Sequence, residues 1–76
     1  MTEVRIFGQL EDITSTPTVL IKKVGDTDSL LVELFIAYPA LKEKKFSIAV
    51  NQNIIHQNTM LDDNAQVALL PPFSGG

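Results

Sequence analysis

The residues of this chain that could do chemistry lie at its C-terminal end, from Pro71 to Gly76 (PPFSGG). Neither proline has a backbone N–H for a sheet ladder, so together they end the strand-like run before them. Two glycines without side chains follow Ser74, and we expect a free α-carboxylate on Gly76. From Pro72 to Gly76 an extended chain reaches at most about 17 Å. These residues predict a thin peptide tail that presents one carboxylate at its tip.

A carboxylate at neutral pH is a poor electrophile, because the anion repels nucleophiles and has no leaving group. Activation by ATP would convert it to an acyl-adenylate, which sulfur, nitrogen or oxygen nucleophiles can attack. Gly75 and Gly76 suit this chemistry because no Cβ crowds the carbonyl and glycine can thread a narrow enzyme channel. Glycine ends also occur as frayed or engineered termini, but the order of strand, prolines, aromatic residue and Ser-Gly-Gly favours a functional tail.

Other catalytic arrangements are weak in this sequence. It has no cysteine, hence no thiol nucleophile, disulfide or thiolate zinc site. Its single histidine, His56, lacks a nucleophile and an orienting acid, and we interpret it as a surface or edge-strand residue. Asp62 and Asp63 precede a strand, a position typical of capping and solvation. We therefore predict no metal site, no bound cofactor and no active site within the chain itself.

Length and composition predict one small soluble domain. The 76 residues are 45% hydrophobic and 20% charged, with a formal net charge of −3. The sequence shows no basic stripe for nucleic acid, no apolar span for a membrane and no signal-like start. We expect a cytoplasmic protein that binds neither nucleic acid nor membrane, and an acidic C-terminal half that favours a partner with a basic pocket. Lys42, Lys44 and Lys45 are interpreted as a solvated helix end.

The apolar pattern predicts the elements that must position the tail. Alternating apolar residues predict five strands, at residues 2–8, 18–24, 46–50, 54–55 and 66–70. Apolar residues from Leu30 to Tyr38 recur at spacings of three and four, which predicts one main helix. We expect Asp26 or Asp28 to cap this helix and Pro39 to end it. Residues 51–53 predict a tight turn, and Met60 and Leu61 are expected to fill the core.

Five strands and one main helix predict an α+β domain over residues 1–71, with residues 72–76 as a flexible, extended tail. One helix covers only one face of the sheet, so the other face should be bare. Phe7, Ala68 and Leu70 have the parity to lie on that bare face. We expect a protein partner to contact these three residues and the tail residues Pro71, Pro72, Phe73 and Ser74. The alternative is that Leu70 tucks under the edge of the core.

The chain resembles the MoaD/ThiS group of ubiquitin-like sulfur carriers, which includes the small subunit of molybdopterin synthase. The resemblance rests on four segments: Tyr38–Leu41, Ile48–Gln52, Leu61–Asp63 before Val67 and Ala68, and above all Pro71–Gly76. The chain departs from the family pattern at residues 63–67, where Asp-Asn-Ala-Gln-Val replaces Asp-Gly-Asp-Glu-Val. It also has Leu69-Leu70 where the family has an aromatic pair.

The resemblance implies a β-grasp fold with a mixed sheet, and a cycle of sulfur transfer. In that cycle an E1-like enzyme adenylates the Gly76 carboxylate, and a sulfurtransferase then supplies sulfur to form a thiocarboxylate. The tail enters the large subunit of molybdopterin synthase, within a heterotetramer, and gives sulfur to cyclic pyranopterin monophosphate in molybdenum cofactor biosynthesis. Catalysis would lie in the large subunit. The absence of cysteine agrees with this scheme, because only the C-terminus could then carry sulfur.

Three alternatives remain open at this point. The chain could carry sulfur for thiamine or another product, which Pro71 and Pro72 disfavour. It could be a ubiquitin-like modifier whose adenylate ends in an isopeptide bond to lysines of target proteins. It could also be a binding module that uses only its bare sheet face.

Overall fold

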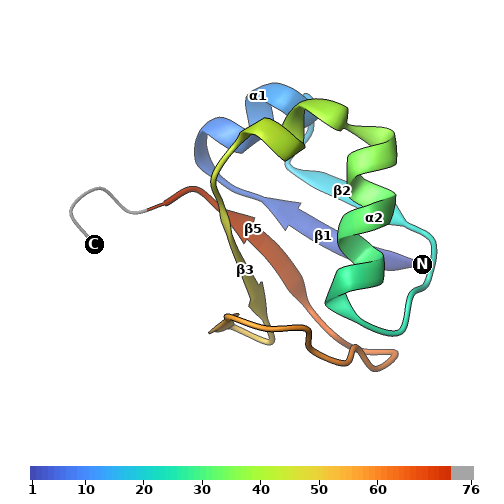
Figure 1. Ribbon diagram of the computed structural model, residues 1–76. Coiled ribbons are helices and arrows are strands. Elements are labelled where there is room, and N and C mark those ends of the chain that lie inside the picture. Colours follow the sequence, from blue (N-terminus) through green and yellow to red (C-terminus); the bar gives the residue numbers. More distant parts are fainter. Residues whose placement is uncertain (73–76) are drawn as a thin grey trace.

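The structure is a computed structural model of the chain and describes residues 1–72. One sheet of five strands carries the main helix across one of its faces (Figure 1). The strands are β1 (Thr2–Ile6), β2 (Thr18–Ile21), β3 (Ser47–Val50), β4 (Asn53–Ile55) and β5 (Val67–Leu70). The helices are α1 (Glu11–Thr14) and α2 (Thr27–Ala37), with two short 3₁₀ helices, η1 (Gly8–Leu10) and η2 (Pro39–Glu43). The five predicted strands and the main helix are confirmed.

The sheet has the strand order β2-β1-β5-β3-β4. β1 and β5 run parallel, with Val4 opposite Val67 and Ile6 opposite Leu69. The other neighbouring strands, β1 with β2, β3 with β4 and β3 with β5, pair antiparallel. A mixed sheet with its first and last strands side by side at the centre, crossed by one helix, is the β-grasp arrangement that the resemblance implied. The α+β prediction is therefore confirmed.

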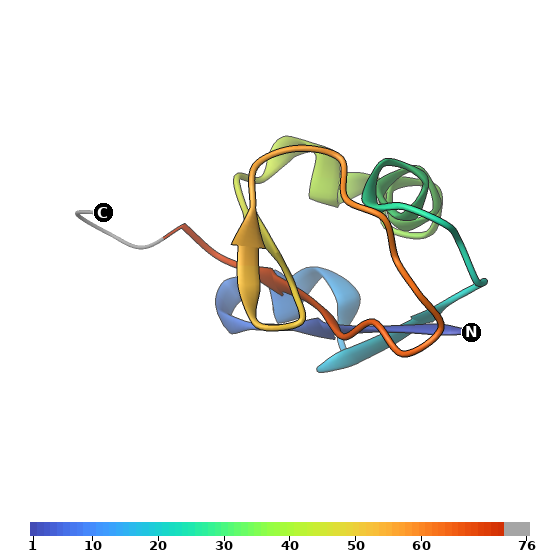
Figure 2. The same cartoon turned by 90° about the horizontal axis from the view of Figure 1, so that it is seen from below.

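The core lies between α2 and the sheet. Val4, Ile6 and Leu69 point toward the helix, because alternate residues of a strand face the same side. Leu30 and Leu34 of α2 and Leu41 of η2 are fully buried against them. Burying a side chain of this size stabilises the fold by roughly 1.5–3 kcal/mol. Figure 2 shows the helices on one side of the sheet, and no helix of residues 1–72 covers the other face.

Two strand ends differ from the prediction. The first strand ends at Ile6, before Gly8, because Gly8 has a positive φ of 61° that turns the chain into η1. The second ends at Ile21, before the exposed lysines at 22 and 23. The predicted turn between β3 and β4 is present, with Asn51 and Gln52 both at positive φ. Positive φ at both central residues is the pattern of a type I′ turn, whose twist matches that of the two flanking strands.

Asp26 rather than Asp28 caps α2, and a distant loop supports it. Oδ1 of Asp26 accepts a hydrogen bond from the Ser29 N–H at 2.9 Å. The side-chain amide of Asn58 donates to Oδ2 of Asp26 at 3.2 Å, while its Oδ1 accepts from the Asp28 N–H at 2.9 Å. The buried Thr27 hydroxyl accepts from the Thr59 N–H at 2.9 Å. The loop after β4 is thus tied to the start of α2.

The prediction that Met60 fills the core was wrong. Leu61 is buried, as predicted, but the Met60 side chain is 76% exposed. Met60 forms an isolated bridge with Asp26, and the Leu61 N–H donates to the Gly25 carbonyl at 2.9 Å. This extended backbone turns successive side chains to opposite sides, so only one of the two can point inward.

The cap of α2 predicts a dependence of stability on acid. The hydrogen bonds from Ser29, and secondarily from Asn58, lower the pKa of the Asp26 carboxyl. Because this pKa is lower in the folded than in the unfolded chain, the cap contributes stability above the unfolded pKa of about 3.9. That contribution is lost as the pH falls below about 4 and through the folded pKa. Thermal unfolding of the wild type should therefore show this loss.

Two variants of Asp26 separate the effect of its capping hydrogen bond from the effect of its negative charge. Asp26→Ala should lower the melting temperature at neutral pH by roughly 5 °C, because the Ser29 N–H loses its acceptor. Asp26→Asn keeps an acceptor oxygen, so it should remain closer to the wild type at neutral pH and lose less stability in acid. If Asp26→Asn lost stability below pH 4 as steeply as the wild type, Asp26 would not be the titrating group.

Candidate functional site: the tail root and the open sheet face

β5 carries the chain from the centre of the sheet into the tail. The Leu69 carbonyl accepts a hydrogen bond from the Phe7 N–H at 3.1 Å, and Leu70 pairs with Ser47 of β3. The next two residues, Pro71 and Pro72, are called here the tail root. Pro71 is half-buried and Pro72 is exposed. The tail root leaves the sheet at the end opposite the N-terminus (Figure 1).

Gly8 makes room for the tail root. A Cβ placed on Gly8 would lie 2.7 Å from Cγ of Pro71, closer than carbon atoms can approach without displacement. The proline ring therefore packs onto the bare backbone of Gly8, and this contact sets the direction in which the chain continues. The sequence did not mark Gly8 as functional. Gly8 follows Phe7, whose N–H donates to the Leu69 carbonyl of β5. The closeness of Gly8 to Pro71 is therefore apparent only once the pairing of these strands is known.

The uncovered side of the sheet, called here the open face, carries Phe7, Ala68 and Leu70 as their parity predicted. The structure places all three around a hollow of about 330 Å³. Leu70 lines this hollow, so it lies on the open face and does not tuck under the edge of the core. Ala49 lies opposite Ala68 in the β3–β5 pair, and these two small side chains leave the space for the hollow.

Sequence reasoning missed two other residues of the open-face hollow. Ile54 of β4 is 43% exposed and pairs with Ala49, so it stands on the same side of the sheet as Phe7, which is 42% exposed. Arg5 lies opposite Ala68 and also lines the hollow. Arg5 forms no ion pair with any carboxylate of residues 1–72. The open face thus combines apolar walls with one unpaired cation.

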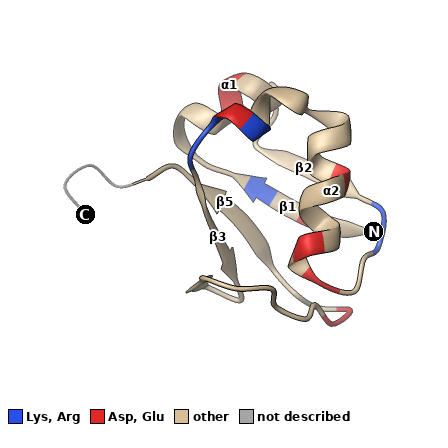
Figure 3. Cartoon of the chain, viewed as in Figure 1, with Lys and Arg blue, Asp and Glu red and all other residues tan. Residues whose placement is uncertain are grey.

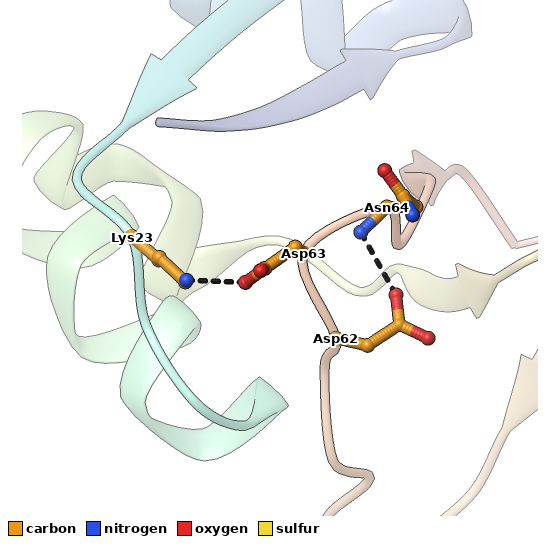
Figure 4. Close-up of polar contacts among 4 residues, drawn as sticks. All are labelled: Lys23, Asp62, Asp63 and Asn64. Atoms are coloured by element: carbon orange, nitrogen blue, oxygen red, sulfur yellow. Dashed lines mark hydrogen bonds and ion pairs between the residues drawn. The ribbon is translucent and has the colours of Figure 1, made fainter.

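The other chemically active side chains serve the fold or the surface. Figure 4 shows that Asp62 and Asp63 point apart. Oδ1 of Asp62 accepts from the Asn64 N–H at 2.9 Å, and Asp63 forms an ion pair with Lys23. The hydrogen bond from Lys23, aided by its charge, lowers the pKa of Asp63. His56 is exposed just after β4.

Residues 1–72 hold no group of three or more side chains arranged to bind a metal ion. Within the same residues, no helix has the length and apolar character needed to cross a membrane. The predicted tail residues Phe73, Ser74, Gly75 and Gly76 lie outside the described residues. Their roles therefore remain predictions from the sequence.

The contact between Gly8 and Pro71 predicts the effect of adding one methyl group. Gly8→Ala should destabilise the fold by about 1–3 kcal/mol, because alanine is strained at positive φ and its Cβ would displace the Pro71 ring. Thermal or denaturant unfolding measures this loss. NMR chemical shifts of residues 69–72 should report the displacement of the tail root.

Gly25→Ala is the matched control, since a Cβ on Gly25 would meet no atom within 4 Å. It should leave stability unchanged or raise it by about 0.4–1 kcal/mol. Equal stabilities of the two variants would contradict the proposed packing of Pro71 on Gly8.

Comparisons with known proteins agree with this geometry. A model of the ThiS family matches residues 4–76. The molybdopterin synthase sulfur carrier subunit of Arabidopsis thaliana is 26% identical over 78 aligned positions, which span 97% of this chain and 81% of the plant protein.

Two solved structures cover 99% of this chain. One is a protein–protein complex of subunits 1 and 2 of the molybdopterin-converting factor from Helicobacter pylori 26695, with 33% identity, a TM-score of 0.74 and 97% of the matched chain covered. The other is the small archaeal modifier protein 1 of Methanosarcina acetivorans, with 26% identity, a TM-score of 0.82 and 95% of that chain covered. The family match spans the sheet, the open face and the Pro71–Gly76 tail, and this chain belongs to the ThiS family of sulfur carriers.

Proposed function

We propose that this chain is the sulfur-carrier small subunit of a molybdopterin synthase and carries its sulfur as a thiocarboxylate on Gly76. The observation that carries the proposal is the path of β5, which runs from the sheet centre past the open face directly into the Pro71–Gly76 segment. The plant relative and the Helicobacter pylori complex support this choice among sulfur-carrier pathways.

The proposed cycle begins with activation of the carboxylate. An oxygen of the Gly76 carboxylate attacks the α-phosphorus of ATP, and pyrophosphate leaves. A sulfurtransferase supplies hydrosulfide equivalents, which attack the acyl carbon and displace AMP. One carboxylate oxygen has then been replaced by sulfur. The tail delivers this sulfur to cyclic pyranopterin monophosphate in the large subunit, as part of molybdenum cofactor biosynthesis.

Every step of this cycle needs a partner enzyme. The chain has no cysteine, and its residues 1–72 hold no metal cluster. Its single histidine is exposed just after β4. The chain therefore contributes a tail that partner proteins can bind and an open face on which they can dock close to that tail. An E1-like enzyme would activate the tip, and the large subunit would use it.

The open face is the proposed docking surface for the large subunit. Its hollow of about 330 Å³ can accept an apolar side chain between Phe7 and Ile54. Apolar anchors in such hollows contribute most of the affinity in many protein interfaces. Because Leu70 lines the hollow and Pro71 follows it directly, a subunit seated there would also receive the tail. Two carriers on two large subunits would give the heterotetramer.

A second candidate function is protein modification. The similarity to the small archaeal modifier protein 1 supports it, because the same fold there belongs to a modifier. The two functions share the adenylate and differ in its acceptor. A sulfur nucleophile gives a thiocarboxylate, whereas a lysine amine gives an isopeptide bond to a target protein. The mass of the product therefore separates them.

Intact mass spectrometry tests the leading proposal. Incubation with an E1-like adenylating enzyme from the same organism, ATP and a sulfur source should raise the mass by about 16 units through exchange of oxygen for sulfur. A chain lacking Gly76 should fold normally, since the change lies beyond the tail root, and should not gain this mass. Absence of both the adenylate and the mass shift in the full chain would contradict the proposal.

A surface substitution tests the open face. Ile54→Glu should weaken binding to the large subunit at least about tenfold, or about 1.4 kcal/mol, because it places a charge beside the apolar hollow. Val32→Glu is the matched control, since Val32 is an exposed apolar residue on the outer side of α2. Isothermal titration calorimetry should detect the loss for Ile54→Glu only. Equal binding by both variants would place the large subunit on another surface.

A further inference from the structure

Three lysines that the proposed sulfur cycle leaves unused lie in or just after η2. They are Lys42, Lys44 and Lys45, called here the basic cluster. Lys44 and Lys45 line a hollow of about 210 Å³ together with Pro71 and Pro72. In Figure 3 the blue segment between η2 and β3 borders the point at which the tail root leaves the sheet. Two lysines distant in sequence from the tail root thus lie beside it.

The lysines at the other end of the molecule are already paired. Lys22 lies 3.5 Å from a carboxylate oxygen of Glu33, and Lys23 pairs with Asp63. Lys44 and Lys45 make no ion pair within residues 1–72. Asp12 also lines their hollow, and Glu43 precedes Lys44, yet neither comes within 4 Å of a lysine nitrogen. The positive charge at the tail root is therefore available to a partner.

A helix end accounts for only part of this cluster. η2 is a 3₁₀ helix of five residues with Lys42 in its last turn. Lys44 is the capping residue and Lys45 lies beyond it, in an exposed segment that leads to β3. So short a helix sums few peptide dipoles, and their effect fades beyond the last turn. The earlier interpretation as a solvated helix end is right about exposure but does not explain why two lysines flank the tail.

We infer that Lys44 and Lys45 form an electrostatic docking site for an acidic rim around the channel of the tail-adenylating enzyme. This inference rests on the proposed function. The chain carries a net charge of −3, so an acidic partner is repelled by most of its surface and attracted at the tail root. An encounter biased in this way brings the tail to the channel mouth first.

The adenylating enzyme fits this surface better than the large subunit does. The large subunit already has a proposed contact at the apolar open face, which leaves the charged tail root to the enzyme that activates the tail. Exposed charge pairs speed association while adding little lasting affinity, which suits a brief encounter. A division of this kind would let one tail serve two partners in turn, the first recognised mainly by charge and the second mainly by apolar packing.

Charge reversal at two places on the molecule tests the inference. Lys44→Glu/Lys45→Glu and the control Lys22→Glu/Lys23→Glu change the net charge equally but at opposite ends of the sheet. The assay is ATP-dependent adenylation by the E1-like enzyme that activates the wild-type chain, measured as kcat/KM for the carrier. The tail-root variant should lose about tenfold at low ionic strength, and the control should stay within about twofold of the wild type.

Salt and a conservative variant complete the test. At 0.5 M salt the Debye length is about 4 Å, so exposed charges are largely screened. The difference in kcat/KM between the two reversal variants should then nearly vanish. Lys44→Arg/Lys45→Arg keeps both charges and should behave as the wild type does. Binding of the tail-root variant to the large subunit should change by less than about twofold.

Four results would overturn the inference. They are equal losses in the two reversal variants, no loss in the tail-root variant, a loss that persists at high salt, and a loss confined to large-subunit binding. Melting temperatures of all variants identify any loss of kcat/KM that comes from unfolding. If the tail-root variant is unfolded, Lys44→Arg/Lys45→Arg still tests whether wild-type activity needs only the two positive charges. Failure of the wild type itself to be adenylated would instead refute the proposed function, so the two failures are distinguishable.

Discussion

The placement of β5 between β1 and β3 is the interaction on which the rest of this structure depends. Hydrogen bonds on both sides hold the strand, and its Val67 and Leu69 fill the core beneath α2. The alternate residues, Ala68 and Leu70, form part of the open face. One short strand therefore supplies the centre of the core, the middle of the proposed docking surface and the base of the tail. A shift of its register by one residue would exchange the first two roles.

This arrangement agrees with the proposed function, in which partner enzymes carry out the chemistry and the chain supplies the position of its tail. Its contribution is position: a rigid sheet ends in two prolines, and the first of them rests on the bare backbone of Gly8. In the proposed function, partners that recognise the open face or the tail root would find Pro71 and Pro72 in a constant position relative to the sheet.

Local patterns in the sequence predicted most of the fold. The spacing of Leu30 to Tyr38 indicated α2, and alternation indicated the strands and the parity of Phe7, Ala68 and Leu70. Local patterns left a choice open, or predicted the wrong side chain for the core, where distant residues decide the outcome. Asp26 is the cap because Asn58 supports it from across the loop, and Met60 points outward because its backbone bridges to Asp26.

The same limit applied to the candidate site. The role of the tail could be predicted from the sequence because the chemistry proposed for it needs only consecutive residues, and that role stays a prediction. The hollow of the open face could not be predicted, since it depends on the register that places Ala49 opposite both Ala68 and Ile54. Likewise, nothing local to Lys44 and Lys45 indicates that η2 returns them to Pro71 and Pro72. Contacts between segments far apart in sequence made these sites.

The central position of β5 also bears on how the protein is made. Synthesis proceeds from the N-terminus, so β1 and α2 leave the ribosome while the middle of their sheet is still missing. Val67 and Leu69 must emerge before the core can close, and the β1–β5 pairing spans nearly the whole chain. Pairings of such long range are slow to form, because the loop-closure entropy is lost before the contacts are gained. A nascent chain therefore cannot complete its fold before the residues that lead into the tail have been synthesised.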